Sequence, residues 1–440
     1  MPMMGYGARR GVAAAQHDPL WARAVFLERT GRLLLVECDL CLLSVAQCDE
    51  LRGRIAGRTG LAPAEILIGC IHTHSAPDTG LAATLAGGEL PPYSSRLHEA
   101  IERAAVDAHA AAASARLGVG QCEVAIGRNR RLANAPIDVT TPVVRIDRSD
   151  GAPLAVLYLH ACHPTALGHD NLLLSADWPA AAAREIESRL PGALAIFALA
   201  AHADVDPRTR GLLDLAIPDQ SVGVSFAETE ALGREVGEAV AQCAEAIETV
   251  SDAEVAASSR RIDLPVHGGG GSGADYEAHV AALRSDALAA LDLPADATVR
   301  TAELYGLEQE RTRGLPDDER RARLARVRVY LRDRTARRIV GGLSAQVEAQ
   351  VLRIGPLALL ALPLEICVDV GLAWRECAPA PFASVVSIAN GWLRYLPHPQ
   401  NFAEPHATEH YEILQSTLAP EAATRLVEVG VDLARETQSA

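Results

Sequence analysis

Short apolar runs that stop abruptly at polar residues recur along this chain, and they constrain its fold more than any other feature of the sequence. A buried strand is expected at residues 65–71, ending at His72, and another at 193–199. Helix-like segments lie at about 46–58 and 178–190. Further elements are expected at 24–43 (a hairpin), 92–114 (a helix), 143–160 (a hairpin), 225–250 (a helix) and 344–362 (strands). This alternation of strands and helices predicts an α/β layered core.

A charged helical segment interrupts the pattern at about residues 267–340. Between Glu308 and Arg338 it holds eleven arginines and six acidic residues. A basic patch is one interpretation, but a solvated helical arm in which Glu and Arg side chains pair is favoured. The length of 440 residues allows one large domain or two closely packed ones. Because strand patterns return after the excursion, we interpret residues 1–440 as a single α/β domain.

Charge and residue usage exclude several functional classes. All 41 basic residues are arginines, and P-loop phosphate chemistry, Schiff-base catalysis and pyridoxal enzymes each need a lysine. The formal net charge of −15 argues against nucleic acid or an anionic membrane as a partner. The most apolar stretch, residues 357–374, is broken by Pro363 and Glu365 and falls short of a membrane helix.

The nine cysteines are scattered without a repeated framework, which predicts reduced thiols in a cytoplasmic protein. Residues 1–10 lack the apolar run of a secretion signal, in agreement with that location. Cys38 and Cys41 form a lone CxxC pair in a strand-like run, where core packing is favoured over metal or redox chemistry.

A His-x-His pair follows the first buried strand. In an extended chain His72 and His74 project to the same side, and this spacing is common among metal ligands. The metallo-β-lactamase pattern fails because Ala76 and Pro77 stand where Asp and His are needed. An amidohydrolase barrel often needs a carbamylated lysine, and HExxH is absent. Two histidines that are simply hydrogen-bonded at a strand end remain an alternative.

Three more polar clusters follow apolar runs. His160 and His163 close the strand that ends near residue 160; one of them is expected to be structural, and His163 lies where the chain turns toward a site. Glu365 is embedded in an apolar run, where a charge is costly unless it is paired with arginine or bound to a metal. Tyr395 lies in the segment 390–395, where an ordinary core or interface tyrosine is the alternative.

Taken together, these clusters resemble the catalytic domain of the neutral/alkaline (non-lysosomal) ceramidases, a family of zinc-dependent amide hydrolases. The matching segments span nearly the whole chain in the family's order, at Met4-Gly-Tyr-Gly-Ala-Arg9, Asp18-Pro-Leu-Trp-Ala-Arg23, His72-Thr-His-Ser-Ala-Pro77, Gly127-Arg-Asn-Arg130, His163-Pro-Thr165, Ser175-Ala-Asp-Trp178, Ala203-Asp-Val-Asp-Pro207, Leu362-Pro-Leu-Glu365, Asn390-Gly-Trp-Leu-Arg-Tyr395 and His410-Tyr-Glu412. The resemblance implies mixed β-sheets with flanking helices, without the C-terminal β-sandwich domain of ceramidases.

By this resemblance the zinc ligands are His72, His163, Glu365 and Tyr395, with His74 and Arg130 as polar groups beside the Zn²⁺ ion. Two imidazoles, a carboxylate and a phenol oxygen leave room for water or substrate on the metal. His74 is then expected to move protons, and Arg130 and Tyr395 to stabilise an oxyanion or hold an acidic substrate group. Asp177 and Asp204 are candidates for carboxylates that orient the histidines, with helix-cap and turn roles as the alternative.

The chain departs from the family where ceramidases carry an active-site serine. That position is predicted to fall on Ala200, and His202 becomes a possible new polar group. We therefore expect a cytoplasmic zinc hydrolase that cleaves a C–N amide bond of a small soluble substrate with a metal-activated water and no acyl-enzyme. An ester, lactone or peptide hydrolase is the alternative among enzymes. A catalytically silent small-molecule-binding protein on the same fold is the alternative from another class.

Overall fold

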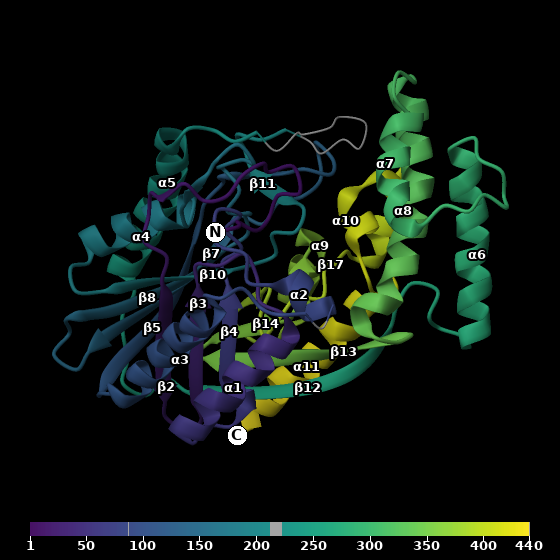
Figure 1. Ribbon diagram of the computed structural model, residues 1–440. Helices are drawn as coiled ribbons and strands as arrows, with labels where there is room; N and C mark the ends of the chain where they lie inside the picture. Colours follow the sequence, from purple (N-terminus) through teal and green to yellow (C-terminus); the bar gives the residue numbers. More distant parts are fainter. Residues whose placement is uncertain (87, 212–221, 440) are drawn as a thin grey trace.

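Three mixed sheets form the centre of the computed structural model, which describes residues 1–86, 88–211 and 222–439 (Figure 1). The first contains β2 (Ala22–Glu28), β3 (Arg32–Cys38) and β4 (Ile66–Cys70). The second has the order β10 (Leu194–Leu199), β8 (Pro153–His160), β7 (Thr140–Arg148) and β5 (Ala115–Glu123). The third has the order β12 (Val255–Pro265), β13 (Ser344–Ile354), β14 (Leu357–Ala361) and β16 (Phe382–Val386). Parallel pairs occur at β3–β4, β8–β10 and β14–β16.

The alternation of side chains along the strands builds two distinct layers of core. In β3, Leu33 and Leu35 pack in a cluster with residues of the second and third sheets, whereas Leu34 and Val36 pack on the opposite side with helical residues. Successive side chains of a strand point to opposite faces, so both faces of this strand are buried. The three sheets therefore share one apolar interior.

Helices cover the outer faces of the sheets. The helices α1 (Val45–Thr59) and α3 (Ser94–Ala110) contact the first sheet, α4 (Trp178–Arg189) and α5 (Phe226–Ala246) the second, and α9 (Val368–Cys377) and α11 (Ala422–Ser439) the third. The α/β architecture with mixed sheets and flanking helices is confirmed. None of the helices in the described ranges combines the length and the apolar run that a bilayer crossing needs.

Two of the predicted helices end earlier than expected. The Ala-rich helix α3 stops at Ala110 because the chain must turn into β5, and alanine's helix propensity cannot override that connection. The helix α5 stops at Ala246 because Val250 exchanges backbone hydrogen bonds with Leu117 beside β5 (2.8 and 2.9 Å). A local sequence pattern does not contain either constraint.

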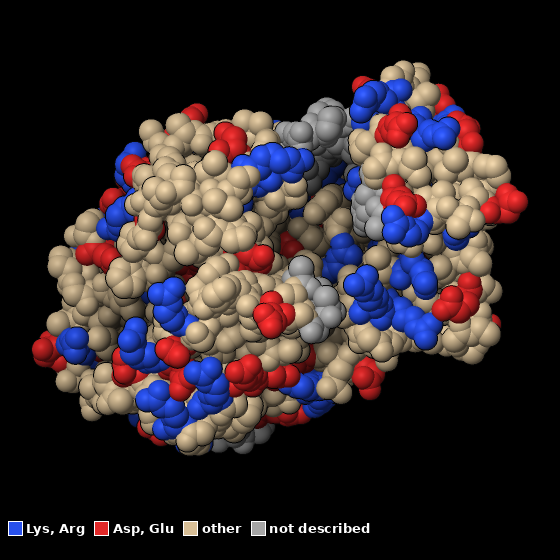
Figure 2. All heavy atoms as spheres, in the orientation of Figure 1, with Lys and Arg blue, Asp and Glu red and all other residues tan. Residues whose placement is uncertain are grey.

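Three helices occupy the segment between β12 and β13, and we call them the helical arm: α6 (Gly273–Ala290), α7 (Thr301–Arg311) and α8 (Asp317–Val340). They stand together at one side of the molecule (Figure 1) and share a small core of their own around Tyr276 and Tyr330. Arginines of α8 pair with acids of the arm, as Arg323 does with Glu319 at 2.9 Å. On the face in Figure 2, basic and acidic side chains are interspersed, and the surface is hollowed beside the arm.

Short elements connect these layers around the functional residues. They are β1 (Ala15–Gln16) with β9 (Leu173–Leu174), β6 (Gly127–Asn129) with β11 (Val205–Pro207), β15 (Glu365–Ile366) with β17 (Tyr395–Leu396), and α2 (Leu81–Ala86), α10 (Tyr411–Gln415) and the 3₁₀ turns Pro63–Glu65, Pro399–Ala403 and Ala407–Glu409. The β15–β17 pair is parallel and places Glu365 opposite Tyr395.

Candidate metal centre

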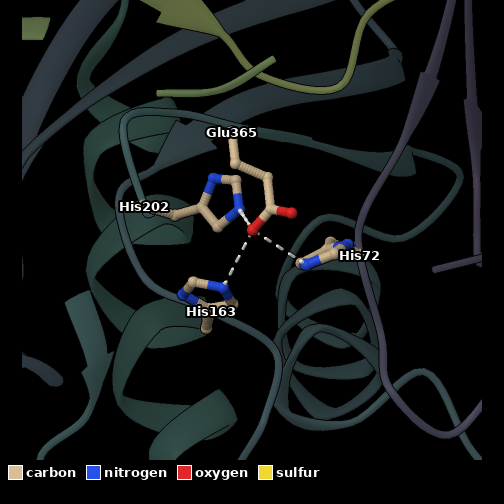
Figure 3. A group of neighbouring side chains, drawn as sticks. All are labelled: His72, His163, His202 and Glu365. Carbon is tan, nitrogen blue, oxygen red and sulfur yellow. Dashed lines mark ion pairs between the residues drawn. The ribbon is translucent and has the colours of Figure 1, made fainter. Parts of the chain in front are cut away.

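Three imidazoles converge on one carboxylate oxygen in the interior of the protein (Figure 3). The Nε2 atoms of His72, His163 and His202 lie 3.4, 3.6 and 3.8 Å from Oε2 of Glu365. All four side chains are buried. The structure thus brings together three of the predicted ligands and adds His202, which the sequence predicts only as a possible polar group.

The three histidines come from the turns that follow three buried strands. His72 follows β4, His163 follows β8 and His202 follows β10. His72 has a positive φ of 66°, an uncommon conformation for a residue with a side chain, and its backbone N–H donates to the carbonyl of Leu40 (2.9 Å). Polar residues that end apolar strands were the signal in the sequence, and the strand ends do carry the site.

Each of these imidazoles is anchored through its other ring nitrogen. The Nδ1 atom donates to a backbone carbonyl in every case: Cys41 for His72 (2.8 Å), Val205 for His163 (3.2 Å) and Ala200 for His202 (3.1 Å). A carbonyl can only accept, so Nδ1 carries a proton, and in the neutral ring the lone pair is on Nε2. This is the anchoring typical of metal-binding histidines.

Three of the four converging atoms lack a hydrogen-bond partner. Nε2 of His163, Nε2 of His202 and Oε2 of Glu365 are buried and have no hydrogen bond. Buried polar atoms without a partner are rare, and three at one point need a common explanation. Burial tends to raise the pKa of Glu365, but His72, His163 and His202 together outweigh burial and hold that pKa well below its usual range. Three nitrogen lone pairs and a carboxylate fit a divalent cation.

His74 lies beside this group with a different environment. Its Nε2 atom is 3.2 Å from Nε2 of His72, and its buried Nδ1 has no hydrogen-bond partner. Burial and then the neighbouring His72 and His163 lower the pKa of His74 well below its ordinary value, so the ring is neutral. A neutral imidazole next to a metal site can accept a proton.

The amino-terminal residues hold His74 in place. The ring of Tyr6 packs edge-on against His74 with 4.6 Å between centroids, and Arg9 donates to the His74 carbonyl (2.8 Å). Gly5 has φ +108°, and a Cβ there would lie 2.4 Å from Cγ of His74. A residue with a side chain therefore cannot replace Gly5 without a shift in His74.

Tyr395 pairs with Glu365 across β15–β17, and Arg130 contacts Tyr395. Arg130 donates from Nη2 to the Tyr395 hydroxyl (3.3 Å). Burial, followed by the charge of Glu365 and a hydrogen bond with it, raises the pKa of Tyr395 well above its usual range. Arg130 is also bound by Glu412 (Nε to Oε1, 2.7 Å) and Asp206 (Nη1 to Oδ1, 3.3 Å). Its charge is therefore already balanced by two carboxylates of the protein.

The predicted orienting carboxylates have other partners. Asp177 caps α4 and accepts from the backbone N–H groups of Ala166 (3.1 Å), Leu167 (2.9 Å) and Trp178 (2.8 Å), so its role is the helix-cap and turn alternative. Asp204 accepts from the N–H of Val368 (2.8 Å) and from two side chains, Asn129 and Arg131, at 3.0 Å each.

Asp206 is the carboxylate that lies against a histidine. Its Oδ1 is 3.6 Å from Nδ1 of His163 and accepts from Thr165 (3.2 Å). Burial tends to raise the pKa of Asp206, but Arg130 and Arg210 bring it to about 2. The segment Ala203–Pro207 had a usable signal, because it places two acidic residues, Asp204 and Asp206, shortly after the apolar strand expected at 193–199.

Ala200 and Cys41 contribute through the backbone. The Ala200 carbonyl accepts from His202 Nδ1 and from the Ser387 hydroxyl (2.7 Å). Cys41 is buried, as core packing predicted, and besides its carbonyl its Sγ lies 3.6 Å from His72 Nδ1. Cys41, His72 and His74 form a second group of possible metal donors that shares His72 with the first.

The whole fold is similar to that of solved ceramidases. The chain superposes on a ceramidase complexed with C2 with a TM-score of 0.71 and 19% sequence identity, covering 99% of this chain and 72% of that one. It superposes on the neutral ceramidase from Pseudomonas aeruginosa with a TM-score of 0.69 and 20% identity, with the same coverage. Fold and site therefore define a ceramidase-like α/β protein with a buried histidine–glutamate centre.

Sequence comparison gives the same result for the amino-terminal half. Residues 1–216 match the family model of the neutral/alkaline non-lysosomal ceramidase N-terminal domain. Neutral ceramidase A of Dictyostelium discoideum is 28% identical over 242 residues, which is 48% of this chain and 34% of that protein. The neutral ceramidase of Mycobacterium tuberculosis is 28% identical over 250 residues, 49% of this chain and 39% of that protein. Residues 1–216 are thus similar to the N-terminal domain of the neutral/alkaline ceramidases, and the matches span little more than a third of the length of these relatives.

Proposed function

We propose that the protein is a zinc-dependent hydrolase that cleaves the C–N bond of an amide. The observation that carries this proposal is the convergence of three buried Nε2 lone pairs on Oε2 of Glu365, two of them and that oxygen without any hydrogen bond. The ceramidase relatives support amide chemistry, because ceramide is an amide. A bound zinc ion would acidify a water molecule and polarise the substrate carbonyl.

His74 is the group placed to move protons. Its neutral ring lies 3.2 Å from His72, so a nucleophilic water held near the ligands would be within its reach. The Nε2 atom would accept a proton from that water and return it to the leaving amine nitrogen. The edge-on packing of Tyr6 holds the ring in one orientation for both steps.

The Tyr395 hydroxyl and the Arg130 guanidinium would support negative charge on the former carbonyl oxygen. Both groups are buried, and Arg130 donates to the Tyr395 oxygen, which strengthens the hydroxyl as a donor. Because Glu412 and Asp206 balance the charge of Arg130, its predicted role of holding an acidic substrate group requires competition with two carboxylates.

For the substrate we propose a small, soluble amide rather than a two-tailed lipid. The net charge of −15 disfavours an anionic lipid surface. Ala200, the residue that the sequence aligns with the family's serine, has no hydroxyl, so the bond would be cleaved by water without an acyl-enzyme.

Metal analysis combined with a substrate panel tests the proposal. We expect about one zinc ion per chain, loss of activity on chelation and recovery when zinc is restored. His163→Ala should lose metal and activity together while circular dichroism shows a folded chain. The panel contains ceramide, N-acyl amines and N-acyl amino acids of increasing chain length, and matched esters. Full activity in the metal-free protein would refute the zinc mechanism, and turnover of esters alone would refute amide specificity.

A further inference from the structure

His202 occupies a position in the centre that is equivalent to those of His72 and His163. Its ring centroid lies 4.4 Å from that of His163 and 5.3 Å from that of His72. Its Nε2 atom is 3.8 Å from Glu365 Oε2, is buried and has no hydrogen bond. Figure 3 shows the three rings on different sides of the same carboxylate oxygen.

The anchoring of the ring nitrogens separates the four histidines of the site into two kinds. His72, His163 and His202 each donate from Nδ1 to a backbone carbonyl, which directs Nε2 to the centre. No such carbonyl holds His74, because its Nδ1 has no partner. His202 therefore has the anchoring of a ligand, whereas His74 does not.

Tyr395, by contrast, has its hydroxyl engaged elsewhere. The oxygen accepts from Arg130 Nη2 at 3.3 Å, and the strand pairing with Glu365 fixes the backbone of Tyr395 beside that residue. The guanidinium that binds this oxygen is itself fixed by Glu412 at 2.7 Å. Binding a cation through Tyr395 would require the oxygen to direct a lone pair away from this guanidinium, whereas His202 needs no rearrangement of its contacts.

We infer that His202, and not Tyr395, is the fourth ligand, so that the centre consists of three imidazoles and one carboxylate. This inference rests on the proposed metal-dependent function. Three neutral imidazoles and one carboxylate leave a net charge of +1 on a divalent ion, and a tyrosinate ligand in place of one imidazole would remove it. Tyr395 then remains a protonated hydroxyl that donates to the substrate oxygen, a role that a metal-bound phenolate cannot fill.

The zinc affinity of variants distinguishes a ligand role of His202 from one of Tyr395. We expect His202→Ala to lower zinc affinity by about 100-fold or more, because even loss of a partner that only orients a ligand costs 10–100-fold. Tyr395→Phe should retain zinc within about tenfold while losing activity. His160→Gln is the matched control, because His160, the buried last residue of β8, bonds to Thr141 (2.9 Å) instead of Glu365. Circular dichroism and thermal unfolding check that each variant is folded.

A cysteine replacement gives a spectroscopic test that does not depend on activity. In Co²⁺-loaded His202→Cys, a direct ligand produces a sulfur-to-cobalt charge-transfer band that the wild-type protein lacks, and Tyr395→Cys should show none. Normal zinc affinity in His202→Ala, loss of zinc in Tyr395→Phe, or a thiolate band in Tyr395→Cys would each overturn the inference and leave the metal-dependent function standing. A wild-type protein that binds no zinc or cobalt would refute both.

Discussion

Glu365 and Tyr395 are direct partners in the two-residue parallel strand pair β15–β17, although 30 positions separate them in the chain. The backbone N–H of Glu365 donates to the carbonyl of Arg394 at 2.9 Å, which fixes the register. The same pairing places the carboxylate at the candidate metal centre and the hydroxyl against Arg130. A change in either strand is therefore expected to affect both Glu365 and Tyr395.

Replacing His74 should separate chemistry from metal binding. Because the ring lacks the carbonyl anchor of the ligands, His74→Ala should keep zinc and lose roughly 10²- to 10⁴-fold in rate. Atomic emission on the purified variant gives the metal content, and steady-state assays give the rate. Loss of zinc in this variant would instead make His74 a ligand.

Substitution of Gly5 should also impair proton transfer, because it displaces His74. Gly5→Ala adds a Cβ that would lie 2.4 Å from His74 Cγ, and the φ of +108° is strained for alanine. We expect a fall in rate of up to about 10²-fold, the size of effect that a misplaced catalytic group can have, with zinc retained. Gly7→Ala is the matched control, because a Cβ there meets nothing within 4 Å. Equal effects of the two substitutions would contradict the contact with His74.

Asp206 is expected to matter for stability as well as for the site. Asp206→Asn removes a buried charge that balances Arg130 and Arg210, and loss of one partner from such a pair costs about 3 kcal/mol or more. Glu235→Gln breaks an exposed pair with Arg208 and should cost at most about 1 kcal/mol. Urea unfolding of both variants measures the difference. A smaller loss for Asp206→Asn than for Glu235→Gln would show that Asp206 does not balance these arginines.

Acid should destabilise the protein partly through His267. Burial lowers the pKa of His267 to about 3, with Arg332 as the next contribution, and its Nε2 bonds the Ser416 hydroxyl (2.7 Å). The unfolded chain binds a proton on this ring below about pH 6.5, but the folded chain does not. The stabilising effect of the low pKa is therefore complete above about pH 6.5 and is lost as the pH falls toward 3.

His267→Gln removes this proton uptake while it can keep the bond to Ser416. Its unfolding free energy should fall less steeply between about pH 6.5 and pH 4, by up to about 1.4 kcal/mol per pH unit. His406→Gln, at an exposed histidine, serves as the control for loss of an imidazole. Metal-free protein is used throughout, so that the metal centre contributes equally to each variant. Parallel pH profiles for wild type and His267→Gln would contradict the expectation.

The elements that local pattern specifies were predictable from the sequence. The helix expected at 46–58 is α1 (Val45–Thr59), and the strand expected at 193–199 is β10 (Leu194–Leu199). Both have a continuous apolar or amphipathic pattern with clear ends, and α1 begins at the Ser44 capping box. The ends of the strands then indicated His72 and His163, because polar residues that follow buried strands tend to gather at functional sites.

The contacts around Arg130 could not be predicted in the same way. Glu412 lies 282 positions from Arg130 and on α10, and no periodicity relates the two residues. The sequence indicates a polar group at His202 but does not predict a ligand there, because a turn does not fix the direction of a side chain as a strand does. The carbonyl of Ala200 gives His202 its direction, and such backbone geometry is set only when the chain is folded.

The pairing of β12 with β13 continues as far as Pro265 and Ser344, so the chain enters and leaves the helical arm at adjacent points. A tight hairpin turn can therefore join the two strands directly, and the ladder of the third sheet would keep its register without the arm. The arm nevertheless contacts α10, through the bond from Arg332 to the carbonyl of Ile413 (3.2 Å), one residue from Glu412. Relatives can thus differ in length at this point without redesign of the body, and engineers can exchange the arm as a module whose contact with α10, the helix that carries Glu412, is known in advance.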